Sequence, residues 1–336
     1  MPSSATDPSS GPASPLDSTS LLAGIDIGGT KCLGLCLAMD GSVVVEERKP
    51  TPKGAENLCD TVAAVVEALA ANAGAPIGAV GVGAPGLVDR NGVLRAAPNL
   101  IGVAEMPIRD MLVERLGLPV TVDNDATCAT EAEWRHGAAT GATDALLITL
   151  GTGIGGGVVS GGALQRGANG FMSEPGHMVV DPNGPPCVCG RRGCWERYAS
   201  GSGLARLARD AAFGGRAAAV VDAAGGDPQA VRGEHVTAAA RAGDAAAREI
   251  LDEFAWWLAL GLANLTNLFD PEVIVLGGGL VEESDLLLEP IRRLYEELLY
   301  ASTHRPRPHL VPAVLGERAG AMGAALIASN ALSSAG

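Results

Sequence analysis

The chain has 336 residues, a formal net charge of −14 and an apolar fraction of 47%. This length fits two domains, no apolar run is long enough to cross a membrane, and the acidic balance argues against nucleic acid or anionic lipid as a partner. The seven cysteines show no paired spacing outside one loop, which indicates a reducing cytoplasm. Residues 1–20, rich in Ser, Pro and Ala, match neither a signal peptide nor a helix, so we predict a disordered tail.

The folded part begins with an apolar segment, residues 21–27, that predicts a β-strand. It runs into a glycine turn, and residues 32–38 predict a second strand directly afterwards. Asp26 lies at the end of the first strand, where a carboxylate could hold a magnesium ion directly or through water. The turn's backbone N–H groups and Thr30 could face phosphate oxygens, but a hairpin with a capping Asp explains the same residues. The turn consists of Gly28, Gly29, Thr30 and Lys31.

A second polar segment follows a predicted strand at residues 118–122. Asp123, Asn124 and Asp125 stand directly before a predicted helix. The simplest interpretation is a helix N-cap, the usual role of Asp and Asn at a helix start. Three polar side chains where one is enough argue for a second role. Upstream, a predicted strand at 79–83 also ends in a loop, which is where ligands bind in open α/β sheets.

The segment at 145–159 repeats the organisation of residues 21–38. A predicted strand at 145–150 runs into a glycine turn, and a further strand follows at 154–159. An internal duplication of this kind indicates the architecture of the whole chain. One glycine turn is a weak sign of phosphate binding, and the second copy strengthens it. The second turn consists of Gly151, Thr152 and Gly153.

Residues 174–196 combine a carboxylate and an imidazole, Glu174 and His177, with three thiols. Glycines and prolines keep helix and strand out of this segment, so the thiols can fold back on one point. One imidazole and three thiols form an established tetrahedral zinc set. The alternatives are a disulfide or buried free thiols, but Cys187 and Cys189 are too close in sequence for an easy bridge, and three thiols leave one unpaired. We therefore predict a structural zinc ion bound by His177, Cys187, Cys189 and Cys194.

The last third of the chain is mostly helical in pattern. Residues 213–236, rich in Gly, Ala and charge, predict a variable loop, and residues 245–268 predict a long helix. Trp256 and Trp257 are expected in the core or at a subunit contact. The next buried strand ends in three glycines, Gly277, Gly278 and Gly279. A strand-to-helix turn is the simplest explanation for them. The small residues at 319–326 predict a helix that packs back on the first lobe.

The two strand, glycine turn, strand units resemble those of the actin, hexokinase and heat-shock ATPase superfamily, where paired hairpins hold nucleotide phosphates from two sides. The motifs LGTGIGGG, SEPGH and CVCGRRGCWE add a specific resemblance to the ROK family of sugar kinases and repressors, above all to its bacterial glucokinases. The resemblance covers residues 21–330. It implies an α/β fold of two actin-like lobes with a cleft between them. The first lobe would be residues 21–125 completed by a C-terminal helix at 318–333, and the second residues 126–317 with the zinc loop.

The resemblance also implies roles for individual residues. ATP and Mg²⁺ are expected in the cleft, with the phosphates between the two glycine turns, Asp26 toward the magnesium ion and adenosine near residues 277–279. Glucose would lie in the same cleft, with Asp125 accepting the proton of its 6-hydroxyl. Zinc would be structural, and His177 would contact both zinc and sugar. The other residues expected to bind the sugar are Asn99, Asn124, Glu174 and Glu196.

Several alternatives stay open. The hexose could be N-acetylmannosamine, N-acetylglucosamine or fructose, and the phosphoryl donor could be polyphosphate, although this acidic chain shows no clear basic groove. Many relatives carry Trp shortly after the residue matching Asn99, whereas Ile101, Gly102 and Val103 stand here, which leaves the shape of the pocket rim open. A sugar-sensing repressor would need a DNA-binding segment before the first glycine turn, where only some 20 low-complexity residues stand. A homodimer or homotetramer is expected, and the sequence does not choose between them.

Overall fold

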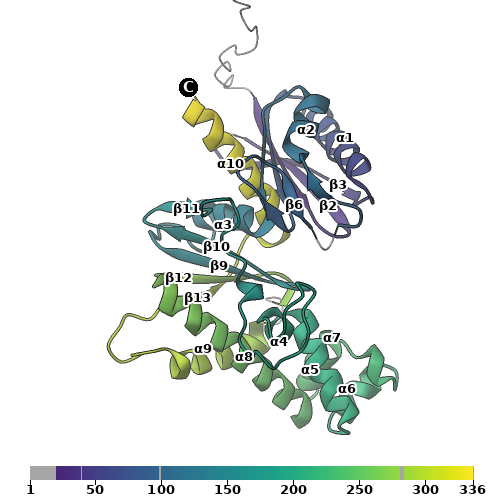
Figure 1. Cartoon of the computed structure of the whole chain (residues 1–336), viewed down its shortest axis with the longest axis vertical. Helices are drawn as coiled ribbons and strands as arrows, with labels where there is room; N and C mark the ends of the chain where they lie inside the picture. The colour runs from purple at the N-terminus through teal and green to yellow at the C-terminus, as the bar shows by residue number, and fades with distance from the viewer. Residues whose placement is uncertain (1–19, 39, 98–99, 281–283, 336) are drawn as a thin grey trace, which may run out of the picture.

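The computed structural model describes residues 20–38, 40–97, 100–280 and 284–335 (Figure 1). The predicted tail, residues 1–20, lies outside this part of the chain except for Ser20, and Asn99 lies outside it as well. Two sheet-containing regions stand one above the other in Figure 1, with helix α10 running alongside the upper one. Within the described ranges, no helix is both long and apolar enough to cross a membrane.

The first sheet has five strands in the order β3-β2-β1-β4-β8. β1 and β2 form the predicted hairpin, with Ile27 paired antiparallel to Cys32 on either side of the glycine turn. β4 pairs in parallel with both β1 and β8, so the carboxyl ends of these three strands meet at one edge, where open α/β sheets bind ligands. The strands are β1 Leu21–Ile27, β2 Lys31–Leu37, β3 Val43–Pro50, β4 Ile77–Ala84 and β8 Val120–Asn124.

The second sheet has the same organisation, in the order β11-β10-β9-β12-β13. Leu150 pairs antiparallel to Ile154 around the second glycine turn, and β12 lies parallel to both β9 and β13. Both sheets therefore consist of an outer strand, a hairpin and two parallel strands, which confirms the predicted duplication. The strands are β9 Ala145–Leu150, β10 Ile154–Ser160, β11 Ala163–Gln165, β12 Val273–Gly277 and β13 His309–Pro312. A small third sheet contains β5 Leu87–Val88, β6 Leu94–Ala96 and β7 Ala104–Met106.

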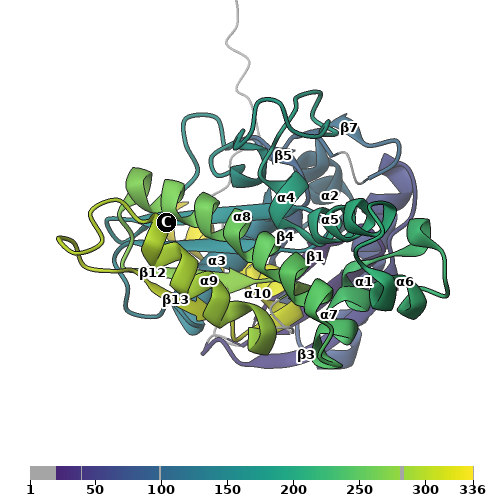
Figure 2. The ribbon, with the colours of Figure 1, turned by 90° about the horizontal axis from the view of Figure 1, so that it is seen from below.

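The helices form three layers around the two sheets. α1 and α2 share a core with the first sheet, α5, α7, α8 and α9 share one with the second, and α3 and α10 lie in a middle core with strands of both sheets. Figure 2 shows the long α8 crossing the second sheet. The α-helices are α1 Ala55–Ala73, α2 Ile108–Leu116, α3 Asp125–His136, α4 Glu196–Ala199, α5 Gly201–Phe213, α6 Ala218–Ala223, α7 Gly233–Arg241, α8 Ala245–Phe269, α9 Ser284–Leu298 and α10 Ala319–Ala335.

The prediction of a loop at 213–236 is wrong, because this segment contains α6, the short 3₁₀ helix Pro228–Ala230 and the start of α7. Its apolar residues are mostly small and are interrupted by glycines and charges, but Val220 and Val231 are fully buried against the helical layer of the second lobe. Most helical stability in proteins comes from such tertiary packing of an apolar face, and composition alone does not reveal it.

The middle layer depends on glycines that let backbones meet. A Cβ atom at Gly24 of β1 would lie 1.9 Å from the carbonyl oxygen of Ala321, and one at Gly81 of β4 would lie 1.8 Å from that of Ala324. On the other side of α10, a Cβ at Gly323 would lie 1.6 Å from the carbonyl oxygen of Cys128 on α3. Helix α10 therefore lies directly between the first sheet and α3. Any side chain at these three glycines would push the layers apart.

Candidate active site

The two glycine turns close in a similar way. The backbone N–H of Gly28 donates to the carbonyl of Lys31 at 2.9 Å, and the N–H of Gly151 donates to that of Gly153 at 3.0 Å. Both turns thus end the first strand of their sheet and return the chain into the second. Exposed glycine-rich backbone of this kind can approach an anion closely, because no Cβ is in the way.

Thr51 fixes the first turn and was missed by the sequence analysis. Its hydroxyl donates to the carbonyl of Gly28 at 2.7 Å, and its N–H donates to the carbonyl of Thr30 at 3.0 Å. The residue follows β3, whose Pro50 pairs with Lys31 at the turn. Only the strand register could have revealed this contact, because Thr51 is distant from Gly28 in sequence.

The second turn is held from a different direction. Helix α5 begins beside it, and the N–H of Gly201 donates to the carbonyl of Gly151 at 2.8 Å. Ser200 caps this helix by accepting from the N–H of Gly203. The third glycine segment lies next to the same turn, because a Cβ at Gly278 would stand 2.5 Å from the carbonyl oxygen of Leu150. Gly278 also has a φ of 87°, which favours glycine.

Asp26 stands at the carboxyl end of β1, facing the start of α10. A Cβ at Gly320 would lie 2.7 Å from the Cγ of Asp26, so this helix position must be glycine for the carboxylate to fit. Burial, together with the negative charge of Asp125, raises the pKa of Asp26 to about 7, and Lys31 opposes this rise. A carboxylate in such surroundings gains from a bound cation, and oxygen donors of this type suit magnesium.

The structure gives the three residues of the polar segment 123–125 different tasks. Asn124 is the N-cap of α3: its Oδ1 accepts from the N–H of Thr127 at 3.0 Å, and its amide donates to the carbonyl of Gly86 at 3.1 Å. Asp123 is buried and accepts from the Asn124 N–H and from Arg166. Asp125 is the first residue of α3, and its Oδ1 accepts from the N–H of Ala126 at 2.8 Å.

Asp125 therefore has a carboxylate that the fold does not need for capping. Burial raises its pKa to about 6, and hydrogen bonds from Ala126, its own backbone N–H and Asn124 oppose this rise. Its helix lies on the second glycine hairpin, because a Cβ at Gly155 would stand 3.0 Å from the Cβ of Ala126. Asp26 pairs with Gly83 in the first sheet, and a Cβ at Gly83 would stand 3.5 Å from the Cα of Asp125. The two acidic residues therefore lie close together, and the negative charge of Asp125 raises the pKa of Asp26.

Glu174 approaches the same acidic group from the second lobe. It follows Ser173, whose φ of 73° is unusual for a residue with a side chain, and it precedes the 3₁₀ helix Pro175–His177. Burial raises the pKa of Glu174, His177 lowers it, and the negative charges of Asp125 and Glu196 raise it. Asp26, Asp125, Glu174, His177 and Glu196 thus form one electrostatically linked group, although they come from four separate segments.

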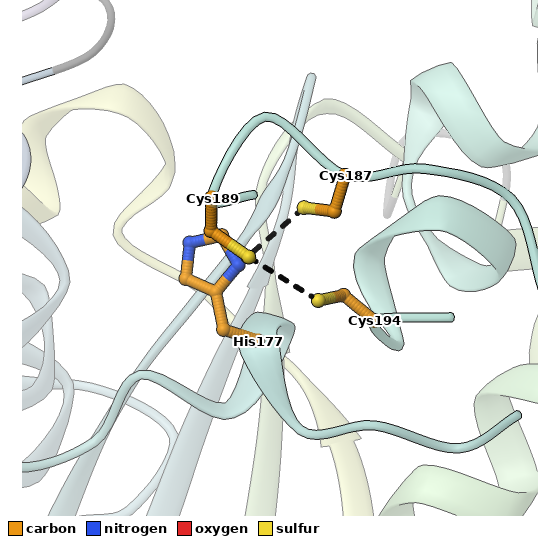
Figure 3. A group of neighbouring side chains, drawn as sticks. All are labelled: His177, Cys187, Cys189 and Cys194. Atoms are coloured by element: carbon orange, nitrogen blue, oxygen red, sulfur yellow. Dashed lines mark hydrogen bonds between the residues drawn. The ribbon is translucent and has the colours of Figure 1, made fainter. Parts of the chain in front are cut away.

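The predicted zinc ligands converge. The ligand atoms of His177, Cys187, Cys189 and Cys194 all lie within 4.8 Å of one another, and Figure 3 shows the four side chains turned toward a common point. Cys189 Sγ is 3.5 Å from Cys194 Sγ, and Cys187 Sγ is 3.7 Å from His177 Nδ1. These separations suit a tetrahedral ion with metal–sulfur bonds of about 2.3 Å and metal–nitrogen bonds of about 2.0 Å. The donor set and its geometry therefore fit zinc.

Glu196 connects this cluster to the second glycine turn. Its Oε1 accepts from Cys187 Sγ at 3.0 Å and lies 3.7 Å from His177 Nδ1. On the other side, a Cβ at Gly153 would stand 2.8 Å from Glu196 Oε2. The loop that carries the metal ligands thus also fixes a carboxylate at the phosphate turn.

Lys31, predicted to contact the nucleotide, is paired with an acidic residue. Its Nζ lies 2.5 Å from Glu317 Oε2, and Arg48 Nη2 lies 2.5 Å from Glu317 Oε1. Lys31 and Arg48 hold the pKa of Glu317 below its usual range. Both side chains of the Lys31–Glu317 pair are about half exposed, so this pairing is weak enough for a phosphate to compete with it.

A cavity of about 500 Å³ lies elsewhere. Neither Asp26, Asp125 nor Glu174 lines it; its walls include Asp123, Glu131, Trp134 and Arg166. The cavity therefore borders the 123–125 segment without including the carboxylates predicted to do the chemistry.

Two sheets of identical strand order, each opening in a glycine hairpin and meeting at a group of carboxylates, define a member of the actin-like ATPase superfamily. The chain belongs to the ROK family, whose model matches residues 22–331. It is 40% identical to a glucokinase of Streptomyces coelicolor, covering 92% of this chain and 97% of that one. It is 33% identical to an N-acetylmannosamine kinase of Escherichia coli, covering 91% and 97%. The solved structure of a ROK family glucokinase from Streptomyces griseus in complex with glucose and AMPPNP superposes with a TM-score of 0.82 at 40% identity, covering 93% of this chain and 100% of that one.

Proposed function

We propose that this chain is a glucokinase that transfers the γ-phosphoryl group of ATP to the 6-hydroxyl of glucose. The observation that carries the proposal is the meeting of Asp26, Asp125 and Glu174 next to two glycine hairpins. The similarity to the Streptomyces glucokinases, one of them solved with glucose and an ATP analogue, supports the substrate pair.

Asp125 is the proposed general base. Its pKa of about 6 leaves most of the molecules ionised near neutral pH, while keeping the carboxylate more basic than an ordinary Asp. It would accept the proton of the 6-hydroxyl as that oxygen forms its bond to the γ-phosphorus. The bond from that phosphorus to the bridging oxygen breaks, and ADP leaves. In such transfers, positioning and electrostatic stabilisation supply most of the rate.

The phosphates would lie between the two glycine turns. Backbone N–H groups and the hydroxyl of Thr30 would bind their oxygens, Lys31 would exchange Glu317 for a phosphate, and Asp26 would hold the magnesium ion directly or through water. When bound, that ion neutralises charge on the β- and γ-phosphates. The proposed nucleotide contacts are Asp26, Gly28, Gly29, Thr30, Lys31, Gly151, Thr152, Gly153, Gly277, Gly278 and Gly279.

Glucose would lie among the carboxylates. Glu174 and Glu196 suit pairs of neighbouring hydroxyls, because a carboxylate can accept two hydrogen bonds. Asn124 keeps hydrogen-bonding capacity beyond its cap, since an amide has two donors and two acceptor sites. His177 would hold zinc with one ring nitrogen and face the sugar with the other. Asn99 belongs to the proposed set, although it lies outside the described residues.

Zinc is proposed as a structural ion of the 177–194 loop. His177, Cys187, Cys189 and Cys194 would hold it, and its role would be to fix His177 and Glu196 at the sugar. We also propose a cytoplasmic location, because none of the seven cysteines, all of them among the described residues, forms a disulfide, and unbridged cysteines persist in reducing compartments. The predicted lobe boundary at 125–126 and a homodimer or homotetramer remain proposals.

A coupled kinase assay over a panel of hexoses and phosphoryl donors tests the function. We expect glucose with ATP to give the highest kcat/KM. Faster turnover of N-acetylmannosamine would instead favour the activity of the Escherichia coli relative. Turnover of glucose with polyphosphate but not with ATP would overturn the assignment of ATP as the phosphoryl donor. No turnover of any hexose would overturn the kinase proposal itself.

A further inference from the structure

A closed loop at residues 166–172 brings Glu174 to the site. The N–H of Met172 donates to the carbonyl of Arg166 at 3.3 Å, which closes the loop directly before Ser173 and Glu174. The loop follows β11 of the second sheet, and Met172 packs against the core of that lobe, but the loop also makes hydrogen bonds to the first lobe. Arg90 donates from its backbone N–H to Asn169 at 3.2 Å and from its Nε to the carbonyl of Gly167 at 3.0 Å.

A further contact between the lobes is an ion pair. Arg166 Nε lies 2.5 Å from Asp123 Oδ2, and only 9% of the Asp123 side chain is exposed. The other carboxylate oxygen of Asp123 accepts from the N–H of Asn124 at 2.9 Å. Asp123 is thus attached both to the Glu174 loop and to the backbone that leads to Asp125.

We propose that Asp123 and Arg166 are the positioning pair that sets Glu174 of the second lobe against Asp125 of the first. The inference rests on the proposed function, because it assigns sugar binding to Glu174 and proton transfer to Asp125. Neither member of the pair touches the sugar; each acts through its neighbours in the chain. A misplacement of about 1 Å between reacting groups can cost about 10²-fold in rate, so a link of this kind matters for turnover.

The cavity of about 500 Å³ makes the pair accessible to mutation. Asp123 and Arg166 both line it, so water can hydrate the Asp123 carboxylate when the guanidinium is removed. The variant Arg166→Leu is therefore expected to fold. Arg166→Lys keeps the charge but not the planar geometry of the guanidinium, so it should restore part of the loss.

A second pair of the same type provides a matched control. Arg95 Nη2 lies 2.7 Å from Asp89 Oδ2; the Asp89 side chain is 9% exposed and Arg95 is 42% exposed, against 32% for Arg166. Both members lie in the first lobe, within the β5–β6 hairpin, and Asp89 Oδ1 still accepts from Asn91 and Val93 when Arg95 is replaced. Arg95→Leu thus removes an ion pair to a similarly buried Asp without breaking a bond between the lobes. It also removes the pair of Arg95 with Glu105, whose side chain is 66% exposed and stays hydrated.

The test measures kcat and both KM values for the hexose that the wild type turns over fastest, so a wrong sugar assignment does not affect it. Arg166→Leu should lower kcat/KM for the sugar about 10- to 100-fold, with the KM for ATP changed less than about twofold and partial rescue by Arg166→Lys. Arg95→Leu should leave all three constants near wild type at a similar loss of Tm.

The double variant Asp123→Asn with Arg166→Leu separates a linked pair from two independent residues. In a linked pair, the double variant is no more impaired than Arg166→Leu alone, because the interaction is already lost. The inference is overturned if Arg166→Leu changes kcat and the KM values no more than Arg95→Leu does. It is also overturned if Arg166→Leu lowers kcat/KM for ATP as much as kcat/KM for the sugar. Loss of all hexose turnover in the wild type would instead count against the proposed kinase, and the same variants would then be compared by calorimetric sugar binding, where an unchanged Kd overturns the positioning role.

Discussion

The two glycine hairpins have the same topology but different chemistry. Asp26 and Thr149 occupy matching positions, each as the last-but-one residue of its strand. The hydroxyl of Thr149 accepts from the N–H of Gly155 at 3.2 Å and so closes its own hairpin. The carboxylate of Asp26 instead faces Gly320, Asp125 and Lys31. The two hairpins therefore share a backbone topology, and only the first carries a carboxylate at this position.

The surroundings of the two turns differ as well. Thr51, directly after the outer strand β3, holds the first turn, and Gly201 at the start of α5 holds the second. The zinc loop lies on the second side only, where Glu196 faces Gly153. We infer that the first hairpin serves the metal and the nucleotide, and that the second lies between nucleotide and sugar.

The largest effect on turnover is expected for Asp125→Asn, at the helix start between the two hairpins. It removes the proton acceptor, and general bases typically contribute roughly 10²- to 10⁴-fold. Turnover should fall at least about 10²-fold, which corresponds to about 3 kcal/mol of barrier. The fold should be kept, because Asn124 and not Asp125 caps α3. Steady-state kinetics measure the turnover, and calorimetric titration measures the affinity for glucose. Near-normal turnover would contradict the assignment of Asp125 as the base.

The same base predicts an acidic limb in the rate profile. Because the pKa of Asp125 is raised to about 6, the basic form is lost as the pH falls through this value, and kcat/KM should fall with it. An ordinary Asp would keep its activity to about two pH units lower. A pH–rate profile of the wild type checks this, and activity that stays constant down to pH about 4 would argue against Asp125 as the titrating group.

The second largest effect is expected for Asp26→Ala, and comparison with the matching position of the second hairpin tests whether the two hairpins have different roles. Asp26→Ala should weaken the use of magnesium-ATP about 10- to 100-fold, as loss of a metal-orienting partner does, while sugar binding stays nearly intact. Thr149→Val at the matching position should cost about 1 kcal/mol of stability through one lost hydrogen bond and leave the magnesium requirement unchanged. Titrating activity against magnesium in both variants tests the comparison. An equal shift in both would show that the hairpins are not specialised.

A smaller effect on turnover is expected from the zinc loop. Purified protein should contain about one zinc per chain, and Cys194→Ser should lose it, because three ligands bind the ion more weakly than four. The loosened loop should raise the KM for sugar through His177 and Glu196, without the change in magnesium requirement expected for Asp26→Ala. Metal analysis by mass spectrometry is the measurement. Active wild-type protein without zinc would contradict the site.

The smallest effect concerns stability. The pKa of Asp26 is raised to about 7 in the fold, so the folded state binds the proton more tightly than the unfolded state does. The group's contribution to the free energy of unfolding is therefore full at low pH and is lost as the pH rises toward about 7. Asp26→Asn should remove this contribution, so that the wild type loses more Tm than the variant between pH about 4 and about 8. Added magnesium with ATP should reduce the difference. Parallel slopes would refute the shifted pKa.

The sequence alone determined the features that depend on local order. The strand, turn, strand units at 21–38 and 145–159 are local, because apolar runs and glycines specify hairpins within a few residues. The Cys3His set is likewise recognisable from residue types in one segment, and the structure brings its four ligand atoms together. The resemblance to the ROK family, which the match of the family model to residues 22–331 confirms, rests on the same local motifs.

Only the tertiary structure decided how these local pieces meet. Thr51 reaches Gly28, Gly320 makes room for Asp26, and Arg166 pairs with Asp123 across distances in sequence that no local pattern spans. The different tasks of the residues at 123–125 followed from which partners surround each side chain, since all three are equally good caps in isolation. Helices within 213–236 formed because apolar residues such as Val220 and Val231 are buried against the second lobe. Packing between distant segments, which is set by the whole chain, thus decided what composition and spacing left open.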